Sequence, residues 1–220
     1  MKSPTTKFAA CLAICSALAG CNGIPTPFIN DPVYSQFFVV NSGPPLPLMF
    51  QGSAVQWNAD YAVTAKHIPF LWNVAHKGRG DLVFFKHKSD KVPVWRQYVG
   101  GEAVTATGLS PFLVPVRSSG HAKVSRVTLL DFNDGVRYGL SDMALVKGMS
   151  GGPVFGQDNQ VVGINIGFIW AGNYKNSPNP EIAATERASI FLPYDEILKE
   201  WNVFQDEIRG KDNQVASLNR

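Results

Sequence analysis

The chain has 220 residues, of which 45% are hydrophobic, so it can form one globular unit with a sizeable core. Its formal net charge is +3, and the basic residues form no cluster with interleaved aromatic residues, so we expect no nucleic-acid partner. No Cys or His motif with metal-ligand spacing occurs, and we expect neither a metal nor another cofactor.

Residues 1–20 are predicted to be a signal peptide. Lys2 and Lys7 precede an apolar stretch, residues 8–19, that no acidic residue interrupts. A stretch of 12 residues is too short to span a bilayer but suits the apolar region of a leader.

Cys21 is the predicted lipidation site. Residues 18–21 (LAGC) resemble a bacterial lipobox, in which the cysteine is diacylated on sulfur and becomes the mature N-terminus. This resemblance implies an exported lipoprotein of the bacterial cell envelope, facing the periplasm or sent to an outer membrane, and held by its N-terminal lipid. The alternative is cleavage after residues 17–19 (ALA), which would give a soluble secreted protein. Cys11 and Cys15 lie in the leader, so we expect no disulfide in the mature chain.

Residues 21–34 are predicted to form a lipid-anchored tether, because three prolines fall between positions 22 and 33. Short apolar segments separated by Gly, Pro and Asn follow, a pattern typical of strands. One of them runs almost directly into His67, and another begins just after Asp81. The strands predicted for this first unit, about residues 35–100, are 37–40, 53–57, 61–65, 82–86 and 92–99.

A second unit, about residues 101–192, repeats this spacing, and the two together predict an all-β barrel or sandwich protein. Its predicted strands are 103–107, 112–116, 122–130, 143–146, 153–155, 161–166 and about 188–192. Apolar residues then recur at helical spacing after Pro193, which predicts a C-terminal helix over 194–208. Residues 206–220 are polar, expected to fray, and too few for a PDZ domain.

Residues 147–154 (KGMSGGPV) are the most informative segment. Gly148 stands two positions before Ser150, and Gly151 and Gly152 follow it. Glycines are needed where the backbone takes positive φ or approaches another group closely. Such a turn exposes a hydroxyl beside converging N–H groups, the arrangement that stabilises an oxyanion. A Gly-rich hairpin without chemistry is the alternative interpretation.

The order His67, Asp81, Ser150, each beside a strand-like segment, resembles the trypsin-like serine proteases, in particular the bacterial HtrA (Deg) branch without a PDZ domain. The matching segments are residues 63–67 (VTAKH), residues 81–86 (DLVFFK) and residues 163–165 (GIN). The resemblance covers about residues 35–200, and we assign a protease domain to 35–205. It implies two antiparallel six-stranded β-barrels of the trypsin-like fold with a C-terminal helix. It also implies an exported serine endopeptidase that cleaves proteins or peptides through an acyl-enzyme.

The resemblance assigns a role to each site residue. Ser150 would be the nucleophile, a weak one until a base takes its proton. His67 would be the general base and acid, because the unperturbed pKa of imidazole lies near neutrality. Asp81 would orient the imidazole, and the backbone N–H groups of Gly148 and Ser150 would form the oxyanion hole.

The resemblance also implies a primary substrate pocket. Ala144 would lie at its base, and Ile164, Asn165 and Ile166 would form one wall. With no acid at the base, a substrate Arg or Lys would lack a partner, so we expect a small to medium apolar residue before the scissile bond. Asp142 lies only two residues away and is the alternative occupant of the pocket.

Rival residues are interpreted as structural. Asp142 precedes an apolar run, as Asp81 does, and is expected to flank the pocket rather than to join a triad. Three other histidines are expected to be solvated loop residues, and two other acids to form turns. These are His76, His87, His121, Asp31 and Asp60. The alternative function is a binding or adhesion lipoprotein that retains the protease fold without turnover.

Overall fold

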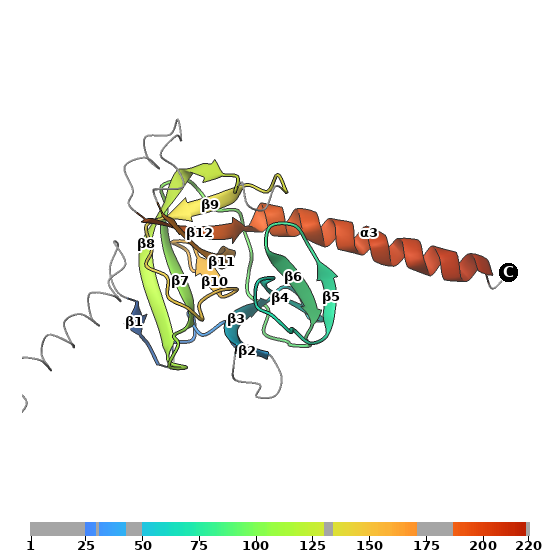
Figure 1. The fold of residues 1–220 in the computed structure, drawn as a ribbon, viewed down its shortest axis with the longest axis horizontal. Coiled ribbons are helices and arrows are strands. Elements are labelled where there is room, and N and C mark those ends of the chain that lie inside the picture. The colour runs from blue at the N-terminus through green and yellow to red at the C-terminus, as the bar shows by residue number, and fades with distance from the viewer. Residues whose placement is uncertain (1–24, 30, 43–49, 130–133, 171–186, 219–220) are drawn as a thin grey trace, which may run out of the picture.

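Figure 1 shows the computed structural model of the chain, which describes residues 25–29, 31–42, 50–129, 134–170 and 187–218. Two β-sheets are followed by one C-terminal helix, so the expected all-β class with a C-terminal helix is confirmed. The predicted signal peptide, residues 1–20, and the predicted lipidation site, Cys21, lie outside the described residues. Within the described ranges, no helix is both long and apolar enough to cross a bilayer.

The first sheet has five strands in the order β2-β3-β4-β6-β5, all paired antiparallel. They are β2 (Phe38–Ser42), β3 (Phe50–Gln56), β4 (Tyr61–Ala65), β5 (Val74–Lys77) and β6 (Leu82–Lys86). Ala65, the last residue of β4, pairs with Leu82, the first residue of β6. This antiparallel register brings the residues that follow β4 beside those that precede β6.

The second sheet has seven strands in the order β1-β8-β7-β10-β11-β12-β9. They are β1 (Thr26–Pro27), β7 (Ala103–Leu109), β8 (Pro115–Val127), β9 (Tyr138–Ser141), β10 (Pro153–Phe155), β11 (Val161–Trp170) and β12 (Arg187–Pro193). Because β9 also pairs with β8, the pairings form a ring of six strands, with β1 added outside it. The sheets therefore have five and seven strands in the described ranges, rather than six each.

Two predicted strands are absent from the described sheets. Residues 92–99 contribute only an isolated bridge from Trp95 to Val161, because Pro93 lacks a donor and the flanking valines are exposed. In the irregular segment 143–146, the first three residues are buried and Val146 is half-buried. The Ala144 N–H donates to the Ser118 side chain at 2.8 Å rather than to a strand. Conversely, β5 and β9 were not predicted, because the polar residues of β5 and the glycine of β9 interrupt the apolar pattern.

The N-terminal segment is bound to the second sheet instead of being a free tether throughout. Within the predicted tether, Thr26 and Pro27 pair with Arg117 and Val116 of β8. Phe28 is buried, and its N–H donates to the Pro115 carbonyl at 3.1 Å. The only part of residues 21–34 that precedes this contact is therefore 21–25.

The C-terminal helix, α3 (Tyr194–Leu218), begins on the second sheet and packs on the first. Its start follows Pro193, and Asp195 and Glu196 complement the positive end of the helix dipole. The ring of Trp201 lies 5.2 Å from that of Phe84 and 5.3 Å from that of Tyr61. The helix continues ten residues beyond the predicted end, and Figure 1 shows its last part extending away from both sheets.

A single core cluster joins the two sheets. It includes Val55 and Leu82 from the first sheet, and Ile164 and Leu192 from the second, all fully buried or nearly so. Burial of such side chains contributes about 1.5–3 kcal/mol each, so the two sheets are held firmly against each other. A site at their junction therefore has two rigid walls.

Candidate active site

The β4–β6 register creates a histidine–aspartate pair. The His67 N–H donates to Asp81 Oδ1 at 2.8 Å, and His67 Nδ1 lies 2.5 Å from Asp81 Oδ2. Because an ionised carboxylate only accepts hydrogen bonds, Nδ1 carries the proton and Nε2 of the neutral ring is an acceptor. The Asp81 side chain is 3% exposed and the imidazole 47% exposed, so a buried carboxyl group is paired with an accessible imidazole.

The backbone at Asp81 is unusual. Asp81 has φ 59° and Gly80 has φ 72°, so both adopt the left-handed conformation that aspartate tolerates better than most residues. The Gly80 N–H donates to Asp134 Oδ2 at 2.7 Å, which fixes this turn. Burial raises the pKa of Tyr138 above its usual value, and the negative charges of Asp134 and Asp81 raise it further. The Asp134 carboxylate, just before β9, thus supports the turn from the second sheet's side.

Ser150 lies in the loop before β10, and the glycines around it are required there. Gly148 has φ 93° and Gly151 has φ 79°, as the sequence predicts for such a turn. The Ser53 hydroxyl of β3 donates to the Gly148 carbonyl at 2.8 Å, and the Ser53 N–H donates to the Ser150 carbonyl at 2.8 Å. The loop of the second sheet is therefore fastened to a strand of the first.

The Ser150 loop touches the strand that leads to His67. A Cβ added to Gly151 would lie 2.2 Å from Thr64 Oγ1 and 3.0 Å from the Ala65 nitrogen. Ala65 is two residues before His67, so only glycine allows the serine loop to approach the histidine this closely. The Ser150 hydroxyl, half-buried, donates to the Ile166 carbonyl at 3.4 Å. Within the described ranges, no hydrogen bond joins Ser150 to His67.

The two N–H groups expected to form the oxyanion hole lie in this loop. Met149 between them donates to the Val146 carbonyl at 3.2 Å, and Gly151 donates to the Asn165 carbonyl at 2.7 Å. No hydrogen bond from the N–H of Gly148 or Ser150 to another described residue is present. Backbone N–H groups that donate within the protein therefore alternate in this loop with N–H groups that could donate to a substrate oxygen.

The residues expected to form the pocket are all buried. Ile164 belongs to the core between the sheets, and the Asn165 side-chain amide donates to the Thr107 carbonyl at 3.0 Å. Ala144 is 4% exposed and Ile166 is 5% exposed. Of the predicted wall, the Ile166 carbonyl accepts a hydrogen bond from the Ser150 hydroxyl.

The exposed side chains of β11 follow the predicted pocket wall in the chain. Phe168 and Trp170 on β11 are 40% and 52% exposed, and their rings meet edge to face at 5.8 Å. A β-bulge between Asn165 and Gly167 shifts the strand alternation and brings this change of facing. In the sequence, this exposed aromatic pair could have been noticed from the aromatic residues at alternate positions after the GIN segment.

The rival acids have structural roles. Asp142 Oδ1 accepts the His121 N–H at 2.6 Å, and Lys123 Nζ lies 3.5 Å from Oδ2, so this carboxylate is fastened to β8. Asp31 accepts the Val33 N–H at 3.0 Å within a turn. Asp60 lies in the β3–β4 turn, as predicted.

Two of the rival histidines are more engaged than predicted. The His76 side chain, on β5, is 9% exposed, stacks on Phe204 at 5.1 Å and lies 3.3 Å from Glu207 Oε2. His87 stacks on Phe38 at 4.1 Å, and its Nδ1 lies 2.8 Å from Gln56 Oε1. Burial against aromatic rings, which sequence spacing does not reveal, explains why the expectation of solvated loops was wrong for these two.

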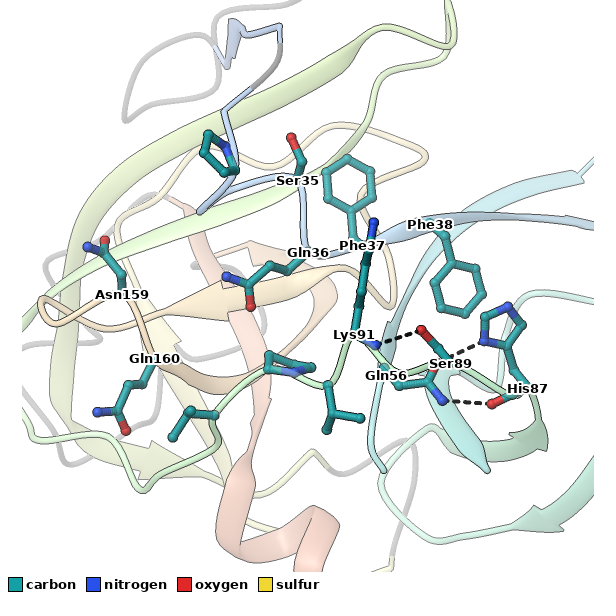
Figure 2. A pocket seen from close by; sticks show the side chains of 14 residues that line it. Ser35, Gln36, Phe37, Phe38, Gln56, His87, Ser89, Lys91, Asn159 and Gln160 are labelled. Carbon is teal, nitrogen blue, oxygen red and sulfur yellow. Dashed lines mark hydrogen bonds between the residues drawn. The ribbon is translucent and has the colours of Figure 1, made fainter. Parts of the chain in front are cut away.

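Figure 2 shows that His87 and Gln56 line a groove of about 810 Å³. The groove is bounded by residues 32–38, the segment 89–94 and the turn at Asn159 and Gln160. None of its lining residues is His67, Asp81 or Ser150, so His87 belongs to a different part of the molecule from the serine loop.

Comparison with known proteins agrees with this architecture. The family model described as Peptidase S7, Flavivirus NS3 serine protease, matches residues 58–178. These residues contain the His67–Asp81 pair and the Ser150 loop. No curated protein sequence gives a significant match.

Solved structures with the same fold include the active form of the Rv3671c protease from M. tuberculosis, with 13% identity, a TM-score of 0.57 and coverage of 80% of this chain and 86% of that one. The serine endoprotease from Yersinia pestis has 16% identity, a TM-score of 0.58 and coverage of 81% and 67%. The HtrA-type protease AlgW with a decapeptide has 18% identity, a TM-score of 0.55 and coverage of 79% and 63%. At these identities the likeness shows the fold alone, and the predicted trypsin-like fold is confirmed.

Proposed function

Because the chain belongs to the Peptidase S7 family of serine proteases, we propose that it hydrolyses peptide bonds with a triad of Ser150, His67 and Asp81. The family makes the protein a serine endopeptidase, and the triad assigns the chemistry to three side chains. The observation that carries the assignment is the His67–Asp81 pair, with a buried carboxylate on one side of the ring and the Ser150 loop packed on the adjoining strand.

In the proposed mechanism, His67 Nε2 takes the Ser150 proton as the serine oxygen attacks the substrate carbonyl carbon. Asp81 stabilises the imidazolium formed, and the N–H groups of Gly148 and Ser150 bind the oxyanion. The imidazolium then protonates the leaving amine, which leaves an acyl-enzyme on Ser150. Water, deprotonated by His67, hydrolyses this ester and restores the serine.

The transfer from Ser150 to His67 needs one local change. The hydroxyl is bonded to the Ile166 carbonyl, and a turn about χ1 into another staggered rotamer redirects it. Catalytic hydrogen bonds are often long or misaligned without substrate, so this arrangement is compatible with turnover.

We also propose that the protease is exported and anchored through a lipid on Cys21, on the lipobox-like residues 18–21. The substrates would be proteins or peptides met at the cell envelope. The decapeptide bound to the HtrA-type protease AlgW, a protein of the same fold, supports a peptide substrate.

A binding or adhesion lipoprotein without turnover is the second candidate. The Ser150–Ile166 hydrogen bond favours it, since it holds the hydroxyl away from a base. Labelling with a fluorophosphonate probe separates the two, because the probe reacts only with an activated serine and needs no knowledge of the substrate.

We expect the wild type to be labelled, and Ser150→Ala and His67→Ala to remain unlabelled while circular dichroism reports an unchanged fold. Ser35→Ala serves as the control, since Ser35 is exposed and lines the groove that contains none of the three triad residues. A wild type that stays unlabelled would exclude the proposed triad in favour of the binding protein.

A further inference from the structure

The turn between β5 and β6 carries Asp81 and is held by groups from other parts of the chain. Gly80 and Asp81 have positive φ angles of 72° and 59°. Such a conformation costs free energy in a residue other than glycine, so it persists only where its surroundings impose it. At the end of β4, the Lys66 N–H donates to the Asp81 carbonyl at 2.8 Å, and Lys66 Nζ donates to the Gly78 carbonyl at 2.8 Å. The two N–H groups in the middle of the turn need acceptors from elsewhere.

Glu200 of α3 accepts the first of these N–H groups. Its Oε2 accepts the Arg79 N–H at 3.0 Å, and its Oε1 accepts a hydrogen bond from Arg79 Nε at 2.7 Å. The Glu200 side chain is 6% exposed, and a Cβ added to Gly78 would lie 3.0 Å from Oε2, so the carboxylate is packed against the turn. The hydrogen bond between Arg79 and Glu200, together with the charge of Glu200, raises the pKa of Arg79 above its usual value. Arg79 is two residues before Asp81, so α3 is joined closely to the orienting acid.

Asp134 accepts the second N–H group, that of Gly80, at 2.7 Å. Two carboxylates, one from α3 and one from the segment before β9, thus accept consecutive N–H groups, as anions do in the concave backbone of a turn. His76 Nε2 lies 3.8 Å from Glu200 Oε2, too far for a hydrogen bond. Within the described ranges, the hydrogen bonds to the Glu200 carboxylate therefore come from Arg79.

Docking of α3 does not require a carboxylate at this position. The helix packs on the first sheet through Trp201 and Phe204, whose rings contact those of Phe84 and Tyr61. A carboxylate costs free energy to bury unless it is paired, and an apolar residue at a buried position often stabilises a protein equally well. The turn that Glu200 holds therefore explains this residue better than the packing of the helix does.

We propose that Glu200 is a positioning residue of the protease: through the Arg79 N–H it holds the turn in which Asp81 adopts its left-handed conformation, and so keeps the Asp81 carboxylate on His67 Nδ1. The inference rests on the proposed function above. It makes the C-terminal helix a part of the catalytic apparatus, although no residue of α3 touches the triad directly in the described ranges.

The first test compares two replacements of Glu200 by steady-state kinetics on a cleaved peptide. Glu200→Leu removes the acceptor at similar size, and we expect it to lower kcat by about 10- to 100-fold with KM unchanged, since a small misplacement of a catalytic group costs this much. Glu200→Gln keeps an amide oxygen for the Arg79 N–H and should retain most of the wild-type kcat. A wild-type kcat in Glu200→Leu would overturn the proposal.

The second measurement reports on the placement of Asp81 without turnover. The proton on His67 Nδ1 gives a proton NMR signal far downfield while Asp81 accepts its hydrogen bond, and loss of this signal in Asp81→Asn identifies it. We expect the signal to persist in Glu200→Gln and to shift or disappear in Glu200→Leu. An unchanged signal in Glu200→Leu would contradict the positioning role.

Phe204→Leu is the matched control, because Phe204 is 6% exposed and lies one turn after Glu200 on the same face of α3. It should lower the urea midpoint of unfolding without changing kcat or the Nδ1–H signal. An equal loss of kcat in Phe204→Leu and Glu200→Leu would mean that loosening of the helix is the cause, and would overturn the proposal. If Glu200→Leu does not fold, Glu200→Asp, which is one methylene shorter, takes its place with the same expected direction for kcat and for the signal.

Labelling with the fluorophosphonate probe separates this inference from the function on which it rests. Equal labelling rates in the wild type and in Glu200→Leu would exclude the positioning role and leave the triad in place. An unlabelled wild type would exclude the proposed function, and the Nδ1–H signal would then still decide whether Glu200 holds Asp81.

Discussion

The histidine–aspartate side and the serine side of the site are built differently. His67 and Asp81 follow and precede two strands in regular antiparallel register, and two hydrogen bonds join them. Ser150 lies in an irregular loop that depends on left-handed glycines and on contacts with Ser53. The comparison teaches that the proposed base and acid are positioned by the sheet, whereas the proposed nucleophile is positioned by a loop that packs on β3 and β4. The two sides should therefore respond differently to substitution.

The largest expected effect is loss of the nucleophile or of the base. Ser150→Ala and His67→Ala should each lower kcat by about 10⁶-fold, as in proteases whose triad acts as a unit. The double variant should be no slower than either single one. Steady-state kinetics on a cleaved peptide measures this, and additive losses would show that the two sides do not act together.

The orienting acid comes next. Asp81→Asn should lower kcat by about 10⁴-fold, because an amide can hold the wrong tautomer of His67. Asparagine also tolerates the left-handed φ of 59°, so the fold should persist.

Asp142→Asn and Asp60→Asn are the matched controls for the acid. Asp60 lies in the β3–β4 turn, and the Asp142 carboxylate accepts a hydrogen bond from β8. Full turnover in Asp81→Asn, together with inactivity of either control, would refute the assignment.

On the serine side, Gly151→Ala should detach the loop. The added Cβ would lie 2.1 Å from the Ser53 carbonyl oxygen, at a φ of +79°. We expect a loss of about 3–5 kcal/mol in the free energy of unfolding, the combined cost of overpacking and strain, together with loss of activity. Urea denaturation and probe labelling measure the two effects.

Gly101→Ala separates strain from contact. Gly101 has a similar φ of +86°, but no atom lies within 4 Å of its added Cβ. It should cost only about 1–2 kcal/mol and leave activity intact. Equal losses of unfolding free energy in both variants would mean that the close packing of the serine loop on β4 contributes nothing to stability.

The smallest expected effect on activity concerns the ion pair between Arg96 and Glu102, which contacts none of the three triad residues. Burial would raise the pKa of Glu102, but hydrogen bonds from Arg96 and from the Val99 N–H outweigh it, and the pKa lies below its usual value. Hydrogen bonds from Arg96 also lower the pKa of Asp158. A lowered folded-state pKa stabilises the protein above the carboxyl's ordinary pKa, and this stability is lost as pH falls.

Glu102→Gln should therefore be less stable than the wild type near neutral pH by about 1–3 kcal/mol, the range for hydrogen bonds to charged groups. The difference should shrink as the pH falls below about 4, where the wild-type carboxylate becomes protonated. Denaturation at pH 7 and pH 3 measures it, and a difference independent of pH would contradict the ionic explanation. Activity at pH 7 should not change, since Glu102 contacts neither side of the site.

The sequence predicts the local structure on both sides of the site, for different physical reasons. The strands beside His67 and Asp81 are short apolar runs of regular spacing, and their pairing follows from it. The motif around Ser150 predicts the glycine turn as well. The bulge between Asn165 and Gly167, which shifts the alternation of β11 beyond the predicted pocket wall, has no signal in the local sequence.

Other features depend on register or burial that no local pattern contains. Arg187 reaches Phe168 only through the β11–β12 pairing, which sequence spacing does not determine. The segment 92–99 has apolar residues in a strand-like run, yet Pro93 and the exposure of Val92 and Val94 keep it outside the sheets.

If Cys21 carries the proposed lipid, the short strand β1 limits the distance between the protease domain and the membrane. For a chain anchored at Cys21, five residues lead to Thr26, where pairing with Arg117 begins. At 3.3–3.6 Å per residue, this linker from Cys21 to Thr26 spans at most roughly 18 Å, which is less than half the extended length of the whole 21–34 segment. The linker ends at β1, which pairs with β8 at the edge of the second sheet, so this edge would face the bilayer. The distance between the site and the membrane, as well as the chemistry of the site, would then determine which peptides the protease can cleave.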